Sequence, residues 1–263
     1  MEQVSCDICA SSLSHGFAER GVTGVGASGD GFMIVRCGGC GLLYVNPRPT
    51  RDEIGRYYQS KYYASAPARP GKKQENIGKR LSRNMKRWIR EDYYGYPCLT
   101  NKALLRRIRK VLLFPEWLRR KCVGREALPY CGAGRLLDVG CGVGSNLRTF
   151  KEQGWDVWGI DMGENAVAQA REIVGDRVHL ATLETSSFPR QSFDVIVFNH
   201  SLEHMFSPSL ALEKAREILT ERGLIVITVP NAASLEARVF GEHWRQWDVP
   251  RHLFHFEPAT LPR

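Results

Sequence analysis

Three glycines in the second half of the chain follow a short apolar run that contains an acid. Leu136–Val139 includes Asp138, and Gly140, Gly142 and Gly144 come directly after it. Glycine permits a tight turn with positive φ and lets a ligand approach the backbone closely. A helical pattern begins at once, and the N-terminus of a helix offers unpaired N–H groups beside the turn. Such a strand–turn–helix corner binds nucleotide-like ligands at the carboxyl edge of a parallel sheet.

The order of these residues argues against a dinucleotide. The dinucleotide fingerprint is G-x-G-x-x-G, whereas the order here is G-x-G-x-G, with Asp138 two residues before Gly140. A carboxylate beside a pyrophosphate would place like charges close together, so this turn suits a cationic or neutral ligand. About twenty residues further on, a second apolar run ends in Asp161, and an acid at that place can accept hydrogen bonds from both ribose hydroxyls.

The strings DVGCGVG and GID resemble those of the class I S-adenosylmethionine-dependent methyltransferases, whose motif has the form D-x-G-C-G-x-G with an acid at the end of the second strand. The resemblance implies that S-adenosylmethionine is the cofactor, with Asp138 near its methionyl end and Asp161 on its ribose. It also implies that Leu183, after the third strand, touches the adenine. The other cofactor-binding residues expected from it are Gly140, Cys141, Gly142, Gly144, Met162 and Asn199.

Regular alternation of strand and helix patterns surrounds the turn. Strands are expected at Arg135–Val139, Val157–Ile160, Arg177–Ala181, Phe193–Phe198 and Leu224–Val229, with helices at Ser145–Gln153, Asn165–Val174 and Ser209–Thr220. This order predicts an α/β fold with a doubly wound, mostly parallel Rossmann-like sheet and right-handed crossovers. The family adds two strands beyond the fifth, and only seven residues follow Phe256. We therefore expect a C-terminally truncated domain in which the fifth strand is an exposed edge that favours self-association.

Two CxxC pairs near the N-terminus have the spacing of a metal site. Cys6, Cys9, Cys37 and Cys40 can present four thiolates tetrahedrally to one Zn²⁺. A disulfide pairing is the alternative, and the reducing cytosol disfavours it. A redox CxxC would need one pair in a βαβ setting rather than two facing pairs. Four thiolates leave no open position for water, so we expect a structural zinc ribbon.

The sequence after the second CxxC pair, CGLLYVNPRPT, resembles a group of bacterial methyltransferases that carry an N-terminal zinc ribbon. A tyrosine cluster follows it: Tyr57, Tyr58, Tyr62 and Tyr63. These rings either line an acceptor pocket or pack the ribbon against the main domain. We expect three regions along the chain: the zinc ribbon over 1–50, a basic helical insert over 51–130, and the methyltransferase domain over 131–263.

Most of the positive charge of the chain lies in the insert. Residues 69–125 hold 18 Lys and Arg against four Asp and Glu, while the other residues carry a net charge of −5. Helices are expected at Lys72–Tyr94 and Asn101–Cys122, with a break or kink at Pro115. The second helix has an apolar stripe and a basic face, which suits an anionic membrane surface, a nucleic acid or a phosphorylated substrate. An ordinary solvated helix whose stripe covers the main domain fits the pattern equally well.

Histidines near the predicted carboxyl edge are the candidates for acceptor activation. The string His200-x-x-Glu203-His204 matches a zinc-protease motif, but it follows a strand and is not in a long helix, so we reject a protease. Either His200, Glu203 and His204 bind a divalent ion, or Glu203 and His204 order the loop over the cofactor. His252 and His255 are further candidate bases, since the unperturbed imidazole pKa is near 6.5. The alternative is that both rings hydrogen-bond backbone in a buried loop. The catalytic candidates are thus His204, His252 and His255.

These patterns predict methyl transfer to a small-molecule acceptor: a sugar, a lipid-linked precursor or a secondary-metabolite hydroxyl. One alternative is an RNA methyltransferase that uses the basic insert, although NHSLEH replaces the Asn/Asp-Pro-Pro-aromatic motif of base-amino methylases. Another is a non-catalytic truncated relative. No apolar run approaches the roughly 20 residues of a membrane span, and no secretory signal is visible. We expect a cytoplasmic protein, with peripheral attachment to the inner membrane surface through residues 72–122 as an option.

Overall fold

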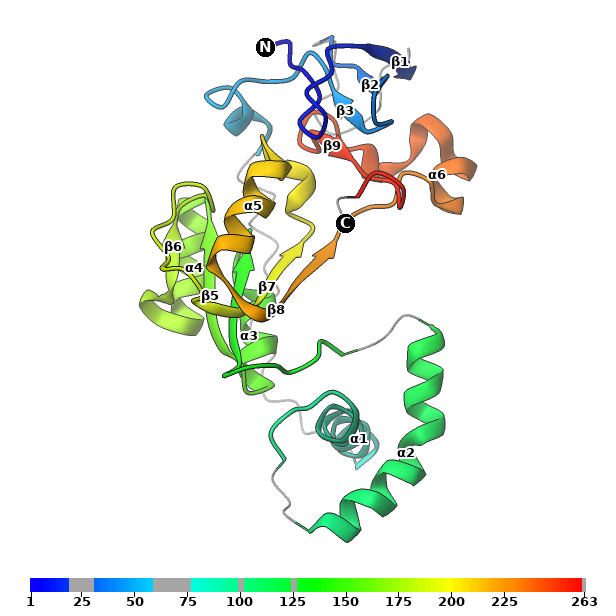
Figure 1. Ribbon diagram of the computed structural model, residues 1–263, viewed down its shortest axis with the longest axis vertical. Coiled ribbons are helices and arrows are strands. Elements are labelled where there is room, and N and C mark those ends of the chain that lie inside the picture. Colours follow the sequence, from blue (N-terminus) through cyan, green and yellow to red (C-terminus); the bar gives the residue numbers. More distant parts are fainter. Residues whose placement is uncertain (19–30, 59–76, 99–101, 124–126, 262–263) are drawn as a thin grey trace.

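The computed structural model describes residues 1–18, 31–58, 77–98, 102–123 and 127–261. Three parts follow one another along its longest axis (Figure 1). A small sheet built mainly from the N-terminus lies at one end, a larger sheet with its helices lies in the middle, and a pair of helices lies at the other end. The predicted tyrosines Tyr62 and Tyr63 lie outside the described residues.

The central sheet has five strands in the order β6-β5-β4-β7-β8, and each neighbouring pair is parallel. The strands are β4 (Arg135–Val139), β5 (Asp156–Asp161), β6 (Val178–Leu180), β7 (Phe193–Asn199) and β8 (Leu219–Thr228). Every residue of β7 except Asn199 is buried, as its apolar run requires for a strand covered on both faces. The predicted doubly wound parallel sheet is confirmed.

Helices cover both faces of this sheet, and alternate residues of each strand meet different helices. Leu137 and Phe198 share a core cluster with Ala211 of α5 (Pro208–Ile218). Leu136 and Val197 each precede one of these residues in their strand and point to the other face of the sheet. They belong to a second core cluster with buried residues of α3 (Ser145–Glu152) and α4 (Glu164–Val174). This alternation follows from the two-residue period of a strand.

The last strand of the sheet begins earlier than expected. β8 starts at Leu219, directly after α5, and Gly223 lies inside the strand rather than in a preceding turn. A register shift between Phe193 and Val195 of β7 accommodates the extra residues. Within the described residues β8 pairs only with β7, so its other edge is open there.

The small sheet is antiparallel and has the order β1-β2-β3-β9. Its strands are β1 (Ser14–Ala18), β2 (Ile34–Cys37), β3 (Leu43–Val45) and β9 (Phe254–His255). The fourth strand was not predicted, because it comes from the opposite end of the chain. Leu43 pairs with His255, the Val45 N–H donates to the Leu253 carbonyl at 2.9 Å, and Arg36 forms an ion pair with Glu257 at 3.0 Å. The ribbon and the C-terminal segment therefore form one folded unit.

The two remaining long helices, α1 (Ile77–Tyr93) and α2 (Ala103–Cys122), contact each other and are called the hairpin here, although α1 crosses α2 rather than running antiparallel to it (Figure 1). The predicted starts at Lys72 and Asn101 lie outside the described residues. The predicted break at Pro115 is wrong, since α2 continues through that residue. None of the residues of α2 is buried, so its apolar stripe does not cover the main domain. No helix among the described residues combines the length and the apolar character needed to cross a membrane.

The hairpin is attached at the amino edge of the central sheet. Tyr96, just after α1, lies in a buried aromatic group with Tyr130 and Trp155, and the Trp155 indole N–H donates to the Tyr96 hydroxyl at 3.0 Å. Tyr130 precedes β4 and Trp155 precedes β5. The glycine turn after β4 therefore lies at the opposite edge of the sheet from the hairpin.

Candidate cofactor and acceptor site

The glycine turn after β4 has the backbone conformation that its sequence predicts. Gly140, Gly142 and Gly144 have φ values of 75°, 53° and 81°, which L-residues with side chains rarely adopt. A Cβ at Gly140 would lie 2.5 Å from the Cβ of Ser201, so only glycine fits under that residue. A Cβ at Gly142 would meet open space. The turn is thus packed on one side and accessible to a ligand on the other.

Asp161, at the end of β5, holds the turn in place. Its Oδ2 accepts a hydrogen bond from the Gly142 N–H and its Oδ1 accepts one from the Gly163 N–H, both at 2.8 Å. Each carboxylate oxygen has more than one acceptor position. The side chain can therefore fix the turn and still accept hydrogen bonds from two ribose hydroxyls.

Asp138 is a buried carboxyl group without a protein partner among the described residues. The residue is 1% exposed, and neither of its oxygens has a hydrogen bond there. Burial, and then the charge of Asp161, raise the pKa of Asp138 to about 7. An orphaned carboxyl group of this kind is costly without a partner. A ligand that carries positive charge or N–H donors would satisfy it, and the sulfonium and ammonium groups of S-adenosylmethionine meet that description.

The other cofactor residues expected from the sequence lie in different environments. Met162 is 60% exposed beside Asp161, and Asn199 ends β7 at the same edge of the sheet. Cys141 is buried and faces the protein, because a Cβ on Gly159 would lie 2.8 Å from its sulfur. Leu183 is 1% exposed in the main core, so its predicted contact with adenine stays a prediction.

Two of the three predicted catalytic histidines lie side by side beyond the carboxyl edge. The ring centroids of His204 and His252 are 4.6 Å apart. The Nδ1 of His204 lies 2.9 Å from the Arg251 carbonyl, and the Nδ1 of His252 lies 2.7 Å from the Gln246 carbonyl. Because a carbonyl only accepts, each Nδ1 donates its hydrogen to that carbonyl. Burial, and then the neighbouring His252, lower the pKa of His204 to about 4.

The carboxylate of Glu203 lies beside these rings. The residue is 1% exposed, and neither oxygen has a hydrogen-bond partner among the described residues. Ligand atoms of Glu203, His204 and His252 lie within 4.8 Å of one another. The predicted ion-binding group contained His200 instead of His252. In the structure His200 is more than half exposed, with its Nδ1 3.4 Å from Glu203, and this carboxylate raises the pKa of His200.

His255 lies beside His252, with ring centroids 6.4 Å apart. It is 3% exposed in β9 and packs against Trp247, with ring centroids 5.1 Å apart. Burial, and then His252, lower its pKa well below the usual value. Its Nε2 has no hydrogen-bond partner among the described residues, so both roles expected from the sequence, a base and a ring bonded to backbone, stay predictions.

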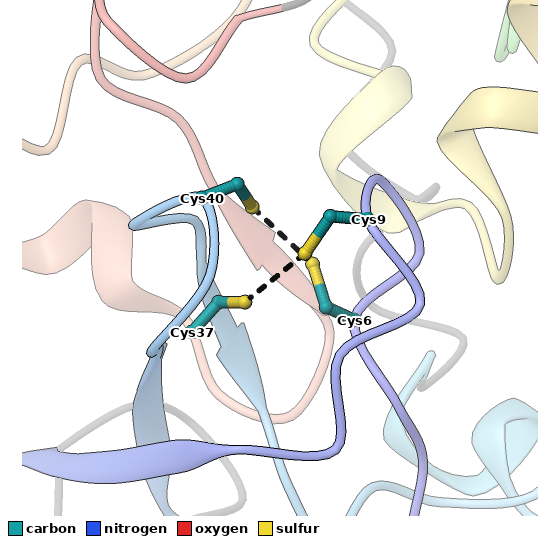
Figure 2. A group of neighbouring side chains, drawn as sticks. All are labelled: Cys6, Cys9, Cys37 and Cys40. Carbon is teal, nitrogen blue, oxygen red and sulfur yellow. Dashed lines mark hydrogen bonds between the residues drawn. The ribbon is translucent and has the colours of Figure 1, made fainter.

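The four N-terminal cysteines converge on one point (Figure 2). Their sulfur atoms lie within 4.8 Å of one another, with Cys6 and Cys40 at 3.5 Å and Cys9 and Cys37 also at 3.5 Å. Burial raises the pKa of Cys6 to about 12. Burial has the same effect on Cys37, but the backbone N–H groups of Cys40 and Gly39 outweigh it and lower its pKa to about 6. This donor set fits the tetrahedral thiolate site predicted from the spacing.

The ribbon covers the carboxyl edge of the central sheet. Asp7 accepts hydrogen bonds from the Ser207 hydroxyl at 2.6 Å and the Ser209 N–H at 2.8 Å, at the start of α5. From the segment that follows the ribbon, the Tyr58 hydroxyl lies 2.9 Å from the Nδ1 of His204. Tyr58 thus packs the ribbon against the main domain and also touches the histidine pair. The sequence indicated both roles for this tyrosine cluster and did not separate them.

Comparison with known proteins agrees with the geometry of the glycine turn. A family model described as a methyltransferase domain matches residues 102–263. The chain belongs to this methyltransferase family. The strand order β6-β5-β4-β7-β8 and the acid at the end of β5 are those expected for its class I S-adenosylmethionine-dependent members.

Curated relatives match a limited part of this methyltransferase-family chain. A ubiquinone biosynthesis O-methyltransferase of Bradyrhizobium diazoefficiens is 30% identical over 145 residues, which cover 52% of this chain and 56% of that protein. A probable S-adenosylmethionine-dependent methyltransferase of Mycobacterium tuberculosis is 30% identical over 118 residues, which cover 44% of this chain and 43% of that protein. The chain spans about half the length of the curated relatives it matches. The solved structure of an S-adenosylmethionine-dependent methyltransferase from Mesorhizobium loti is 28% identical in sequence. The match covers 43% of this chain and 51% of that protein's chain, with a TM-score of 0.36.

Proposed function

We propose that this chain binds S-adenosylmethionine at the glycine turn and transfers its methyl group to a hydroxyl of a small-molecule acceptor. The observation that carries the proposal is the pair of acids at the turn. Asp161 holds the Gly142 N–H, and Asp138 is buried without a protein partner. Family membership supports the same cofactor.

For methyl transfer to a hydroxyl, the protein has to position the cofactor and the acceptor and to accept one proton. When bound, S-adenosylmethionine supplies an electrophilic methyl group on a sulfonium. Asp138 would balance the positive charge of the ligand, and Asp161 would orient its ribose. Holding the acceptor in line with the methyl group supplies most of the remaining rate enhancement.

His204 and His252 are the proposed source of the base. The lowered pKa of His204 keeps its ring neutral near pH 7, with a lone pair on Nε2. A neutral Nε2 can accept the proton of an acceptor hydroxyl as the methyl group is transferred. Glu203, buried beside the two rings, would stabilise the imidazolium that forms.

The acceptor class rests on the chemistry of this pocket and on the relatives. Some relatives are named ubiquinone biosynthesis O-methyltransferase, and a histidine base suits a hydroxyl acceptor. The RNA alternative is weaker, because the basic hairpin is attached at the amino edge of the sheet, away from the glycine turn. A phosphorylated substrate held by the hairpin meets the same objection.

Calorimetric titration of S-adenosylmethionine into the full chain tests the proposal. We expect micromolar binding that weakens on the order of tenfold or more in Asp161→Ala, since two ribose hydrogen bonds and the fixed turn are lost together. Asp156→Ala is the matched control, because Asp156 begins the same strand and forms an exposed ion pair with Arg177. A folded protein that binds no cofactor would contradict the proposal and favour the non-catalytic alternative.

We also propose that Cys6, Cys9, Cys37 and Cys40 hold one structural Zn²⁺. Their converging thiols and the lowered pKa of Cys37 support it. The ion would join the two knuckles of the ribbon, and through the ribbon it would stabilise the cover over the carboxyl edge. Elemental analysis of the purified chain should give about one zinc per chain, the ratio expected for a single four-thiolate site.

A further inference from the structure

Two arginines of α2, Arg106 and Arg109, pair with buried acids of α1. Arg109 donates to Asp92 of α1 through two nitrogens, at 2.6 and 2.8 Å, and lies 2.9 Å from Glu91. The side chains of Asp92 and Glu91 are only 1% and 4% exposed. Asp92 raises the pKa of Arg109 further above its usual value. These ion pairs fix which side of α2 faces α1.

A different side of α2, centred about 100° around the helix axis from Arg109, presents apolar residues to solvent. These residues recur at helical spacing, so they form one stripe. They are between 43% and 74% exposed and comprise Leu104, Leu105, Ile108, Val111, Leu112 and Leu118. A helix that packs on a globular core has the reverse arrangement, with its apolar stripe inside. The stripe of α2 is therefore not used to pack the helix against the described part of the protein. A contiguous exposed apolar stripe of this length marks an interaction surface.

The surroundings of the stripe are strongly basic. Residues 77–98 and 102–123 hold 14 Lys and Arg against three Asp and Glu. Each of the three acids already forms ion pairs with arginines of the hairpin. The surface next to the stripe is therefore left with a large excess of positive charge.

We propose that α2 is a membrane-docking helix, which lies on an anionic lipid surface with its leucine stripe at the boundary of the acyl chains. An amphipathic helix with a basic rim binds such surfaces through buried apolar area and attraction to anionic lipid headgroups. Charge and side-chain type favour a lipid surface over a second copy of the chain or a nucleic acid. A second copy of the chain would bring the two basic surfaces together, and like charges repel. Nucleic-acid bases stack on aromatic rings, so an aliphatic stripe would not contribute to binding them.

Vesicle flotation with the full chain tests the proposal. The probe is phosphatidylcholine vesicles in which about a third of the lipid is phosphatidylglycerol, a charge that attracts basic segments. We expect binding at low salt that weakens as salt rises, and little binding to pure phosphatidylcholine. The double variant Ile108→Asp/Leu112→Asp should reduce partitioning on the order of tenfold or more. Both positions are exposed, so the fold should tolerate the change.

Leu235→Asp is the matched control, because Leu235 is 76% exposed on α6 (Leu235–Phe240), at the other end of the molecule. It should leave partitioning unchanged. The variant Arg107→Glu should weaken binding to anionic vesicles without changing the fold. Three results would overturn the proposal: no vesicle binding at low salt, equal loss in the Leu235 control, or a dimer that the Ile108/Leu112 variant converts to a monomer. Tight RNA binding that survives the double variant would likewise assign the surface to nucleic acid.

Discussion

The two ends of this protein use apolar and charged residues in opposite ways. At the ribbon end, apolar residues such as Leu43 are fully buried between the small sheet and the C-terminal segment. At the hairpin end, α2 has its apolar stripe in solvent and its arginines against buried acids. Both ends are attached to the same central sheet, one at each edge (Figure 1). The first end buries its apolar residues within the chain, whereas the second leaves an apolar stripe exposed.

This difference separates two reasons for an apolar pattern in a sequence. Apolar side chains inside the ribbon end stabilise the fold, so removing them should cost free energy of unfolding. Apolar side chains of the α2 stripe, such as Leu112, are largely exposed in the described structure, so removing them should cost binding only. The predictions below test this contrast from the largest expected effect to the smallest.

The largest effect is expected from removing one thiolate of the ribbon. Cys37→Ser should abolish zinc binding and unfold the ribbon, since a four-thiolate zinc site contributes on the order of 10 kcal/mol of folding free energy. Hydrogen exchange should show loss of protection in β2, β3 and β9 together, with α1 and α2 unchanged. Cys122→Ser is the matched control, because Cys122 is exposed at the end of α2. A wild-type protein that contains no zinc and keeps the ribbon protected would contradict the prediction.

The contrast between the two ends is tested directly by one substitution at each. Leu43→Ala removes a fully buried side chain and should lower the free energy of unfolding by about 2–5 kcal/mol. Leu112→Ala removes a side chain that is 74% exposed and should change it by less than about 0.5 kcal/mol. Denaturant unfolding of both variants measures the difference. Equal costs would mean that the stripe of α2 is packed inside the protein in solution.

The charges between α1 and α2 should matter more than those on the outer surface. Asp92→Asn removes one of the two acids that pair with Arg109 and leaves Glu91, and it should weaken the hairpin by about 2–3 kcal/mol, because the Asp92 pair is largely buried. Arg119→Gln, at an exposed ion pair with Glu116, should cost less than about 1 kcal/mol. Hydrogen exchange in α2 measures both. If Asp92→Asn leaves exchange in α2 unchanged, these ion pairs do not fix the orientation of the helix.

The smallest expected effect is a pH dependence at the ribbon end. The pKa of His204 is about 4 in the folded protein, below its unfolded value near 6.5. The unfolded state therefore binds more protons between these values, and this contribution to stability is lost as pH falls from 6.5 toward 4. We expect a loss of roughly 2 kcal/mol as pH falls from about 7 to about 5, which His204→Gln removes.

Comparison with that variant is essential, because Asp138 acts in the opposite direction. Its pKa is about 7 in the folded protein, above the ordinary carboxyl value. Its contribution to stability is present at low pH and is lost as pH rises through 7. If wild type and His204→Gln lose stability in parallel below pH 6.5, the pH dependence belongs to other groups. The thiolates of the ribbon are then the first candidates, because protons compete with zinc for them.

The sequence predicted the central fold and the cofactor turn closely, because both depend on local patterns. The run from Arg135 to Val139, the glycines and Asp161 fix a strand, a turn and the neighbouring strand within a few dozen residues. The spacing of the four cysteines likewise predicted that they lie together. These features need no knowledge of distant contacts.

The features that the sequence did not predict all depend on contacts between distant segments. The pairing of Leu43 with His255 joins the two ends of the chain, and two-residue strands such as β9 carry no periodic signal. For the same reason the predicted metal-binding group contained only residues that are close in the sequence, and it did not include His252 with Glu203 and His204. The orientation of α2 was open because an amphipathic helix shows which side is apolar, and not which side faces its protein. Only the ion pairs of Arg109 decide that.

The pairing of β9 with β3 also has a consequence for the order in which the chain folds during synthesis. Cys6 and Cys40 are synthesised early, whereas β9, which pairs with β3 of their sheet, is synthesised only after the strands of the central sheet. A growing chain thus carries an open sheet edge at Leu43–Val45 while the central domain is made. Early capture of zinc by the four thiols would hold that edge in shape until Phe254 arrives. We therefore expect zinc shortage during translation to reduce the yield of folded protein more than zinc removal after folding reduces its stability.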